Sequence, residues 1–217
     1  MTKFAVVLSG CGYMDGAEVQ EAVLTLLHLD KRGIDYQCFA PNIEQWHVVN
    51  HLTGEPAGNE RRNVLVESAR IVRGDIMDLA DAKAAEFDAL IVPGGYGVAK
   101  NLSDLALSGE ECQLNPDFLA FAQAFKAARK PIGLACISPA LSVRIFGMDV
   151  ECTIGCDKDT ARVIELMGGR HMHCAVNEIH VDVINKLVTT PAYMYDAGIA
   201  DVSEGLEKMV EAVESLL

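Results

Sequence analysis

The chain lacks a long hydrophobic run, a paired cysteine spacing and any excess of basic residues. Its 217 residues include 18 Lys and Arg against 31 Asp and Glu, which gives a formal net charge of −13. Such a charge argues against nucleic acid and against an anionic membrane as partners. No apolar stretch reaches the roughly 18 residues of a membrane span. The opening MTKFAVVLSG has no signal-peptide cleavage pattern, so we expect a cytoplasmic protein.

Seven cysteines are present, an odd number, and none forms a C-x-x-C pair. Scattered cysteines of this kind indicate free thiols in a reducing compartment. The run His171, His173 and Cys174 matches no standard zinc spacing, so we predict no metal site. The seven lie at positions 11, 38, 112, 136, 152, 156 and 174.

Half of the residues are hydrophobic, which is enough for one well-filled core in a chain of this length. Strand-like and helix-like runs alternate without a linker or repeat, so we predict a single α/β domain over residues 1–217 with a mainly parallel sheet. Segment 45–73 is the least regular and is interpreted as an insertion or an extra strand near the mouth of the site. Strands are expected at 4–8, 34–40, 89–92 and 132–136, an edge β-hairpin at 179–188, and helices at 15–32, 118–129, 159–167 and 204–217.

The segment KPIGLACISPAL (130–141) places Cys136 between a strand-like run and a helix-like run. Ser138-Pro139 has the pattern of a helix N-cap followed by a first-turn proline. A sulfur at that junction would face backbone N–H groups and the positive end of a helix dipole, which lower a thiol pKa. The pattern is that of a nucleophile elbow with cysteine in place of serine, and it predicts an oxidation-sensitive thiol.

Two other strand ends are rich in glycine and polar residues, namely SGCG (9–12) and PGGYG (93–97). Ligands collect at the carboxyl ends of strands in an open α/β sheet, although glycine clusters are equally typical of tight turns. The N–H groups of Gly95 and Ile137 could form an oxyanion hole. Cys11 is a candidate resolving thiol for Cys136. The remaining expected pocket residues are Ser9, Gly10, Glu18, Gly94 and Asn101.

Two glutamates follow the first strand. Glu18 and Glu21 are three residues apart and therefore neighbours on one helix face. Asp15 and Glu18 have capping-box spacing, which gives Glu18 a structural role. Apolar flanks suggest that Glu21 is buried, with a raised pKa, so that it could share a proton with a cysteine thiolate. The alternative is a glutamate that faces solvent.

The segments SGCGYMDGAE, NHLTGE, RNVLVESARI, IVPGGYGVAKNLS and VTTPAYM, with the cysteine segment, resemble the ElbB family, the enhancing-lycopene-biosynthesis proteins described as glyoxalases. That family belongs to the PfpI-type superfamily of flavodoxin-like, class I glutamine amidotransferase-like proteins. The resemblance implies a doubly wound sheet between helices, usually in a homodimer. It also implies a weak, cofactor-independent conversion of glyoxal to glycolate, a lyase-type reaction linked to isoprenoid biosynthesis. Carried onto this chain, the nucleophile is Cys136 and the acid is Glu21.

The chain departs from the superfamily pattern in three places. Ile137 stands where many members have histidine, TTPAYM (189–194) lacks the His-x-Glu of true amidotransferases, and Leu134 is not small. These departures argue against glutaminase and protease activity. Two hypotheses remain: a cysteine-dependent enzyme acting on small α-oxoaldehydes, or a non-catalytic regulatory or binding protein of isoprenoid metabolism that keeps a redox-sensitive pocket cysteine.

Overall fold

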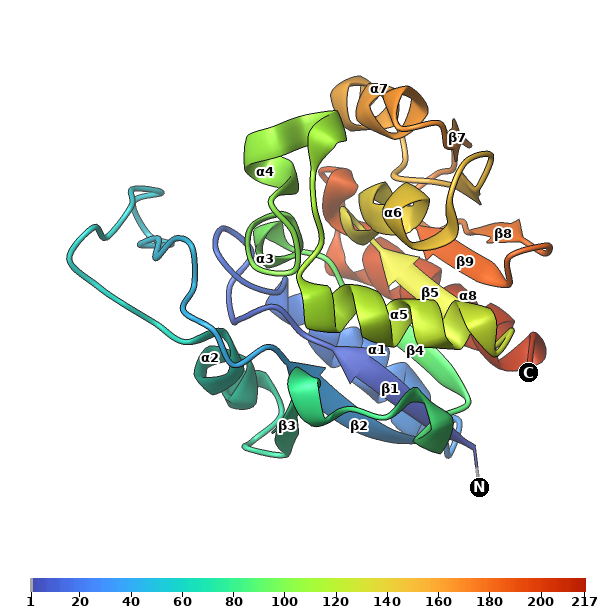
Figure 1. Cartoon of the computed structure of the whole chain (residues 1–217), viewed down its shortest axis with the longest axis horizontal. Coiled ribbons are helices and arrows are strands. Elements are labelled where there is room, and N and C mark those ends of the chain that lie inside the picture. The colour runs from blue at the N-terminus through green and yellow to red at the C-terminus, as the bar shows by residue number, and fades with distance from the viewer. Residues whose placement is uncertain (1) are drawn as a thin grey trace.

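A seven-stranded sheet forms the centre of the computed structural model, which describes residues 2–217 (Figure 1). The strand order is β3-β2-β1-β4-β5-β9-β8, and every neighbouring pair is parallel except β8–β9. This arrangement confirms the predicted flavodoxin-like, doubly wound sheet with an antiparallel hairpin at one edge. The strands are β1 Lys3–Val7, β2 Asp35–Ala40, β3 Ile76–Asp78, β4 Ala89–Val92, β5 Ile132–Ala135, β8 His180–Asp182 and β9 Leu187–Thr190.

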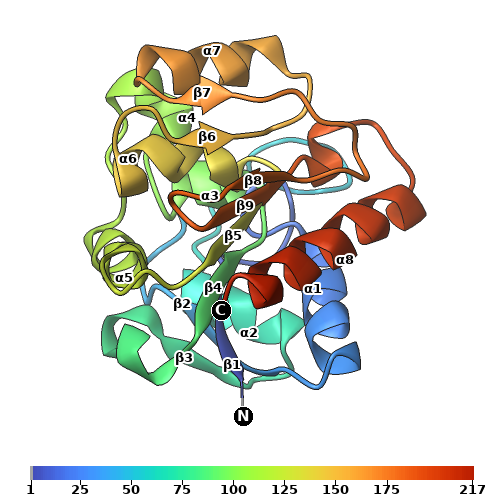
Figure 2. The same ribbon diagram turned by 90° about the vertical axis from the view of Figure 1, so that its right-hand side faces the viewer.

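Helices cover both faces of this sheet (Figure 2). One face carries α1 (Val19–Lys31), α2 (Val64–Ile71) and α8 (Ile199–Ser215), and the other carries α5 (Pro116–Ala127) and α6 (Ser142–Phe146). No helix within residues 2–217 has both the length and the apolar character needed to cross a bilayer. At the carboxyl ends of the strands lie α3 (Tyr96–Lys100), α4 (Leu105–Ser108), α7 (Lys158–Leu166) and the small sheet of β6 (Glu151–Cys152) and β7 (Arg170–His171).

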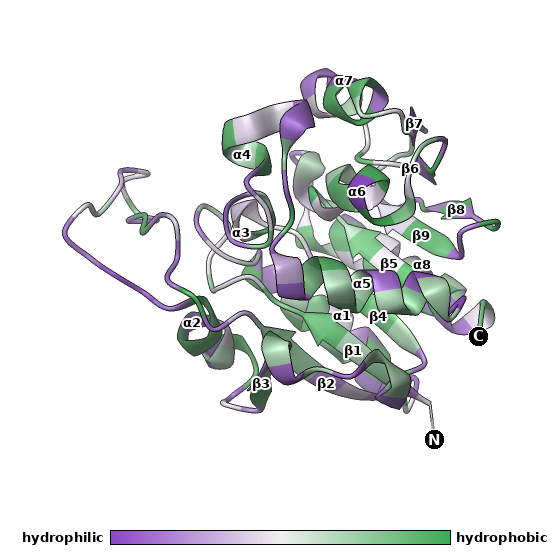
Figure 3. Ribbon diagram, in the orientation of Figure 1, coloured by the Kyte–Doolittle hydropathy of each residue, from purple (hydrophilic) through white to green (hydrophobic). Residues whose placement is uncertain are grey.

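The central strands are mainly hydrophobic, as Figure 3 shows. Every residue of β4, β5 and β9 is buried. A parallel sheet covered on both faces requires such continuous apolar runs, which is why the sequence indicated these strands clearly. On the helices the buried residues recur on one side only. In α1 they are Glu21, Ala22, Thr25, His28 and Leu29.

Three predicted helix starts are wrong, and one of them is that of the last helix, which begins at Ile199 and not at Glu204. The first helix begins at Val19, not at Asp15, because the Asp15 carboxylate accepts the Val49 N–H (2.7 Å) instead of capping a helix. Glu18 itself is the N-cap, and its side chain accepts the Glu21 N–H (2.6 Å). Ser138 is no N-cap either, since its hydroxyl donates to the Pro93 carbonyl (2.9 Å).

The irregular segment after β2 forms no strand of the sheet. Residues 41–63 project from the body of the protein (Figure 1), and their β-bridges are the isolated pairs Glu44–Asn63 and Val49–Pro56. The chain then enters α2, whose N-cap is Asn63. The segment is therefore an excursion followed by a helix, and the extra-strand alternative is not realised.

Candidate active site

The strand order reverses between β1 and β4, and the site lies at this point. From β1 the chain runs outward through β2 and β3, then returns to β4 on the other side of β1. Such a switch point leaves a crevice at the carboxyl ends of the two central strands, where α/β proteins bind ligands. Here the loop before α1, the glycine turn after β4 and the cysteine after β5 come together. The ends of β4 and β5 meet here as predicted, whereas residues 9–12 after β1 do not line the pocket; that loop contributes Tyr13 and Glu18 instead.

Cys136 occupies the elbow after β5 in a strained backbone conformation. Its φ of +60° is uncommon for a residue with a side chain, and its N–H is held by the Thr190 carbonyl (3.0 Å). The backbone N–H groups of Gly95 and Ile137 both donate to the sulfur. The predicted elbow is therefore present, and both predicted N–H donors lie at the thiol. Their role as an oxyanion hole stays a prediction.

Glu21 lies beside this thiol, fully buried on α1. One carboxylate oxygen accepts the Gly94 N–H (2.8 Å), the other accepts the Tyr193 N–H (3.2 Å), and the carboxyl also hydrogen-bonds Cys136. Burial, reinforced by the nearby negative charge of Glu18, raises the pKa of Glu21 from 4.5 to about 7. The prediction of a buried glutamate with a raised pKa is confirmed, and the solvent-facing alternative is wrong.

Gly94 is the surface against which the thiol and the carboxyl both pack. A Cβ built on Gly94 would overlap the Cβ of Cys136 and would lie 2.9 Å from its sulfur and 2.9 Å from a Glu21 oxygen. Carbon contacts that short do not occur in folded proteins without displacement of the neighbour. The glycine in the turn is thus a steric requirement of the Cys136–Glu21 pair.

The pKa of the Cys136 thiol is shifted in the direction opposite to the one predicted. Burial and the adjacent Glu21 carboxylate raise it well above 9.0, and the N–H groups of Gly95 and Ile137 offset this only in part. The helix that was expected to lower the pKa is a short 3₁₀ turn, Ser138–Leu141. Because Cys136 is only 7% exposed, solvent cannot stabilise its thiolate.

A pocket of about 430 Å³ opens onto Cys136. Glu18, Gly95 and Ile137 line it as predicted; Glu18 is the N-cap of α1, and the other two follow β4 and β5. The pocket wall supplied by α7 was not predicted, because nothing in the sequence links the segment of Asp157 and Thr160 to the elbow. The lining residues that were not predicted are Tyr13, Tyr96, Asp157, Thr160, Tyr193 and Met194.

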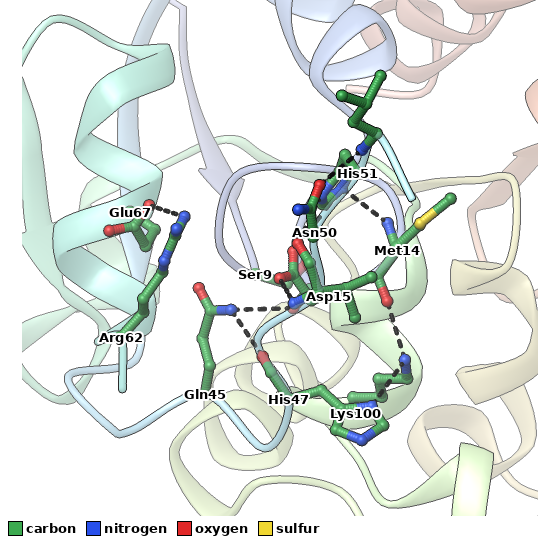
Figure 4. Close-up of polar contacts among 12 residues, drawn as sticks. Ser9, Met14, Asp15, Gln45, His47, Asn50, His51, Arg62, Glu67 and Lys100 are labelled. Atoms are coloured by element: carbon green, nitrogen blue, oxygen red, sulfur yellow. Dashed lines mark hydrogen bonds and ion pairs between the residues drawn. The ribbon is translucent and has the colours of Figure 1, made fainter. Parts of the chain in front are cut away.

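Four residues predicted for the pocket lie elsewhere: Ser9, Gly10, Cys11 and Asn101. Ser9 and Asn101 belong to a polar network that joins the loop after β1 to the excursion 41–63, and Figure 4 shows the part of it around Ser9 and Asp15. The Asn101 amide donates to the carbonyls of Ser9 (2.8 Å) and Asp15 (3.0 Å) and accepts the Trp46 N–H (3.1 Å). Its role is to hold the chain in place, away from the thiol.

Cys11 and Gly10 face α2 rather than the pocket. The Gly10 N–H donates to the Ser68 hydroxyl (2.9 Å). The charges that act on Cys11 are those of Arg62, Glu67, Arg70 and Asp15. Cys11 is absent from the lining of the Cys136 pocket, so the structure gives no support to a resolving role.

The late histidines do not assemble a metal site. His171 accepts the Ile154 N–H (3.3 Å), and His180 pairs with Glu151 (3.1 Å). Within residues 2–217 no three His, Cys, Asp or Glu side chains gather closely enough to hold an ion.

A cysteine at a strand-to-helix elbow, with an acid from the first helix of a doubly wound sheet, defines an amidotransferase-like α/β protein. Solved structures agree on this fold. A DJ-1 superfamily protein from Salmonella typhimurium superimposes with a TM-score of 0.54 at 23% identity, covering 99% of this chain and 95% of that one. Glyoxalase III from Candida albicans gives 0.62 at 14% identity, covering 98% and 97%.

Proteins with a higher sequence identity to this chain identify its family. The chain is 43% identical to the mitochondrial ES1 protein homolog of Rattus norvegicus over 99% of this chain and 84% of the relative. It is 44% identical to the mitochondrial glutamine amidotransferase-like class 1 domain-containing protein 3 of Homo sapiens, over 99% and 83%. The chain therefore belongs to the ES1 protein family. No family profile matches it.

A solved structure of similar sequence is an isoprenoid biosynthesis protein with an amidotransferase-like domain from Ehrlichia chaffeensis. It has a TM-score of 0.93 at 40% identity and covers 100% of this chain and 99% of that one.

The predicted cytoplasmic location is contradicted by these comparisons. The rat and human relatives, and the ES1 protein of Danio rerio at 37% identity, are all mitochondrial by name, which contradicts the predicted cytoplasmic location.

Proposed function

We propose that this protein is a cysteine-dependent, cofactor-independent enzyme of the glyoxalase type, which converts glyoxal to glycolate and accepts other small α-oxoaldehydes. One observation carries the proposal: the Cys136 sulfur lies between two backbone N–H donors and a buried carboxyl whose pKa is about 7. A general base with a pKa near the working pH combines basicity with availability. Glu21 meets that condition, and its hydrogen bond to Cys136 gives it access to the thiol proton.

The first step is addition of the thiol to one aldehyde carbon. The Glu21 carboxylate removes the proton from the Cys136 sulfur as the sulfur–carbon bond forms. Because proton transfer and bond formation occur together, no free thiolate has to accumulate. The reaction can therefore proceed although the pKa of the thiol is raised. The resulting oxyanion is on the carbon bonded to the sulfur, two bonds from the sulfur itself, and within reach of the Gly95 and Ile137 N–H groups that now point at the sulfur. Glu21 then returns the proton and leaves a hemithioacetal.

The second step is an internal oxidation and reduction. Glu21 removes the C–H proton of the hemithioacetal carbon and returns a proton to the neighbouring carbon through an enediol. The first carbon becomes a thioester and the second becomes an alcohol, so no external oxidant is needed. Water hydrolyses the thioester, which releases glycolate and restores the Cys136 thiol. The pocket supplies no histidine for this last step, so we expect slow turnover.

The comparisons support the proposal at the level of the fold. One protein of this fold is named glyoxalase III, and a similar protein at 40% identity is named for isoprenoid biosynthesis. The sequence motifs agree with the ElbB type, for which glyoxalase activity and a link to isoprenoid output are expected. We also propose a homodimer, on the same resemblance.

The test is glycolate formation from glyoxal by the purified protein, followed by NMR, with wild type and Cys136→Ala side by side. We expect glycolate from the wild type and only the uncatalysed rate from the variant. Activity that survives Cys136→Ala unchanged would exclude this mechanism.

A second candidate is a regulatory or binding protein that keeps the pocket without efficient catalysis. The observation in its favour is the composition of the pocket, in which Ile137 lies where a histidine would complete the catalytic set. A strain carrying Cys136→Ser should then resemble the wild type and not a deletion strain. If the point variant reproduces the deletion phenotype, a pure scaffold role is excluded.

A further inference from the structure

The charge of the pocket above Cys136 is negative. Two carboxylates line it, Glu18 at the start of α1 and Asp157 at the start of α7, and Glu21 lies beneath the thiol. The described residues that line this pocket include no Lys, Arg or His. A charged ligand that enters this pocket therefore meets acidic side chains and no basic ones.

Two lysines, Lys100 and Lys158, are close in sequence to residues of the pocket, but neither side chain lines it. Lys100 lies behind Tyr96, with its Nζ 5.2 Å from the centre of that ring, and it donates to the Met14 carbonyl (2.8 Å) outside the pocket. Lys158 follows Asp157 but is exposed. Among the groups with the largest effect on the pKa of Cys136, the charged one is Glu21.

Aromatic rings add partial negative charge to the pocket. Tyr13, Tyr96 and Tyr193 all line the pocket. The face of an aromatic ring carries partial negative charge and attracts cations. Carboxylates and aromatic rings in one cavity are the groups that bind ammonium-type ligands, whereas sites for carboxylate or phosphate ligands present Arg or Lys. The N-termini of α1 and α7 also lie at this pocket, but their N–H groups already bond the Glu18 and Asp157 carboxylates.

We propose that this pocket selects ligands by charge: it admits neutral and cationic compounds, excludes anionic ones, and uses Glu18 and Asp157 as the specificity-determining residues. For catalysis, which rests on the proposed function, neutral α-oxoaldehydes are substrates and their 2-oxo-acid counterparts, such as glyoxylate, are not. The selection itself is a property of the pocket and is independent of any turnover.

The experiment measures entry of charged reagents at Cys136 without using glyoxal. Methanethiosulfonates transfer an alkylthio group to a thiol and release methanesulfinate, and matched reagents exist with a trimethylammonium, a sulfonate or a neutral methyl end. Rates at Cys136 are read by peptide mass spectrometry and divided by the rates with 2-mercaptoethanol, so intrinsic reactivity cancels. We expect the corrected cationic-to-anionic ratio at Cys136 to be about tenfold in low salt, and to fall as salt screens the charges.

Substitutions test whether Glu18 and Asp157 cause the difference between the cationic and anionic rates. Glu18→Gln and Asp157→Asn remove charge but keep the oxygen that caps each helix, at the Glu21 and Thr160 N–H groups. The double variant should lose most of the tenfold ratio. Glu165→Gln makes the same charge change on the exposed side of α7 and should leave the ratio intact.

A ratio near one in the wild type, a faster anionic reagent, or a Cys136 that even the neutral reagent cannot reach would each overturn the proposal. So would a ratio that the double variant retains in full. The salt series on the wild type decides the question if the double variant does not fold. A protein that shows the charge ratio but makes no glycolate disproves the proposed function alone.

Discussion

Two cysteines follow strands of the same sheet, β1 and β5, which are separated by β4, and the surroundings of the two thiols differ in every respect that matters for chemistry. Cys136, after β5, has a φ of +60°, opens onto a pocket and hydrogen-bonds a buried carboxyl. Cys11, after β1, has no place in that pocket and is influenced by the mixed charges of Arg62, Glu67 and Arg70. A glycine-rich strand end with a thiol is therefore not sufficient for a reactive site.

What separates the two strand ends is the use of their backbone groups. After β4 and β5 the N–H groups of Gly94, Gly95 and Ile137 point at a carboxylate and a sulfur. After β1 the backbone groups bond to other structural groups, such as the amide of Asn101 and the hydroxyl of Ser68. The first arrangement stabilises negative charge, and the second fixes the loop that carries Tyr13 to the pocket.

The largest expected effect separates the two thiols directly. Cys136→Ser should reduce glycolate formation to the uncatalysed rate, because a hydroxyl is a far weaker nucleophile than a thiol at neutral pH. Cys11→Ser should change the rate less than twofold. Steady-state rates of both variants, with the fold checked by circular dichroism, make the comparison. Equal losses would mean that the two strand ends act together.

A larger residue at Gly94 should disrupt the site, because its side chain would overlap Cys136 and Glu21. Gly94→Ala places a methyl group where the Cys136 side chain and a Glu21 oxygen now lie, and we expect a loss of about 3 kcal/mol in the free energy of unfolding. Gly58→Ala is the control, since a Cβ there meets no atom within 4 Å. Urea denaturation of both variants tests this. A Gly94→Ala protein as stable as Gly58→Ala would contradict the described contact.

Glu21 should make stability depend on pH. Its pKa is raised from 4.5 to about 7, so the folded state binds this proton more tightly than the unfolded state. The resulting stabilisation is complete below about pH 4.5 and is lost as the pH rises through about 7. With about 1.4 kcal/mol for each tenfold change in proton affinity, the loss is on the order of 3 kcal/mol.

Glu21→Gln should remove that part of the pH dependence. It should also lower stability at acid pH, because the amide offers one oxygen to the two N–H donors of Gly94 and Tyr193. Denaturation of wild type and variant at pH 5 and pH 8 measures both effects. The same slope with pH in both proteins would mean that Glu21 titrates normally.

The smallest effect is expected at the β1 end. Asn101→Ala leaves the carbonyls of Ser9 and Asp15 and the N–H of Trp46 without their partner, which should cost about 1–3 kcal/mol of stability. The alkylation rate of Cys136 should change less than twofold. A large change in that rate would show that the loop after β1 controls the thiol.

The sequence predicted the parts of this molecule that depend on local pattern. The buried run 89–92 is β4 as predicted, and the elbow segment put Cys136 at a strand end. Glu21 was identified because a carboxylate among apolar helix residues needs a partner. The helix start at Asp15 was wrong because the partner of that carboxylate, Val49, comes from a loop more than 30 residues away.

Properties set by distant segments could not be predicted. Asp157 reaches the pocket only through the position of α7 over the sheet. The direction of the Cys136 pKa shift depends on burial and on the short 3₁₀ turn that follows. A strand–helix pattern contains neither the depth of a side chain nor the length of the helix that forms.

The pairing of Cys136 with Glu21 is the central claim, and the pH dependence of cysteine alkylation tests it most directly. Iodoacetamide rates at Cys136 and Cys11 are measured from pH 6 to 10 in wild type, Glu21→Gln and Glu67→Gln. The Glu21 carboxylate raises the pKa of Cys136, and Glu67 raises that of Cys11. We therefore expect Glu21→Gln to move the Cys136 profile to lower pH and leave Cys11 unchanged, with the reverse for Glu67→Gln. A Cys136 profile that is identical in wild type and Glu21→Gln would contradict the pair.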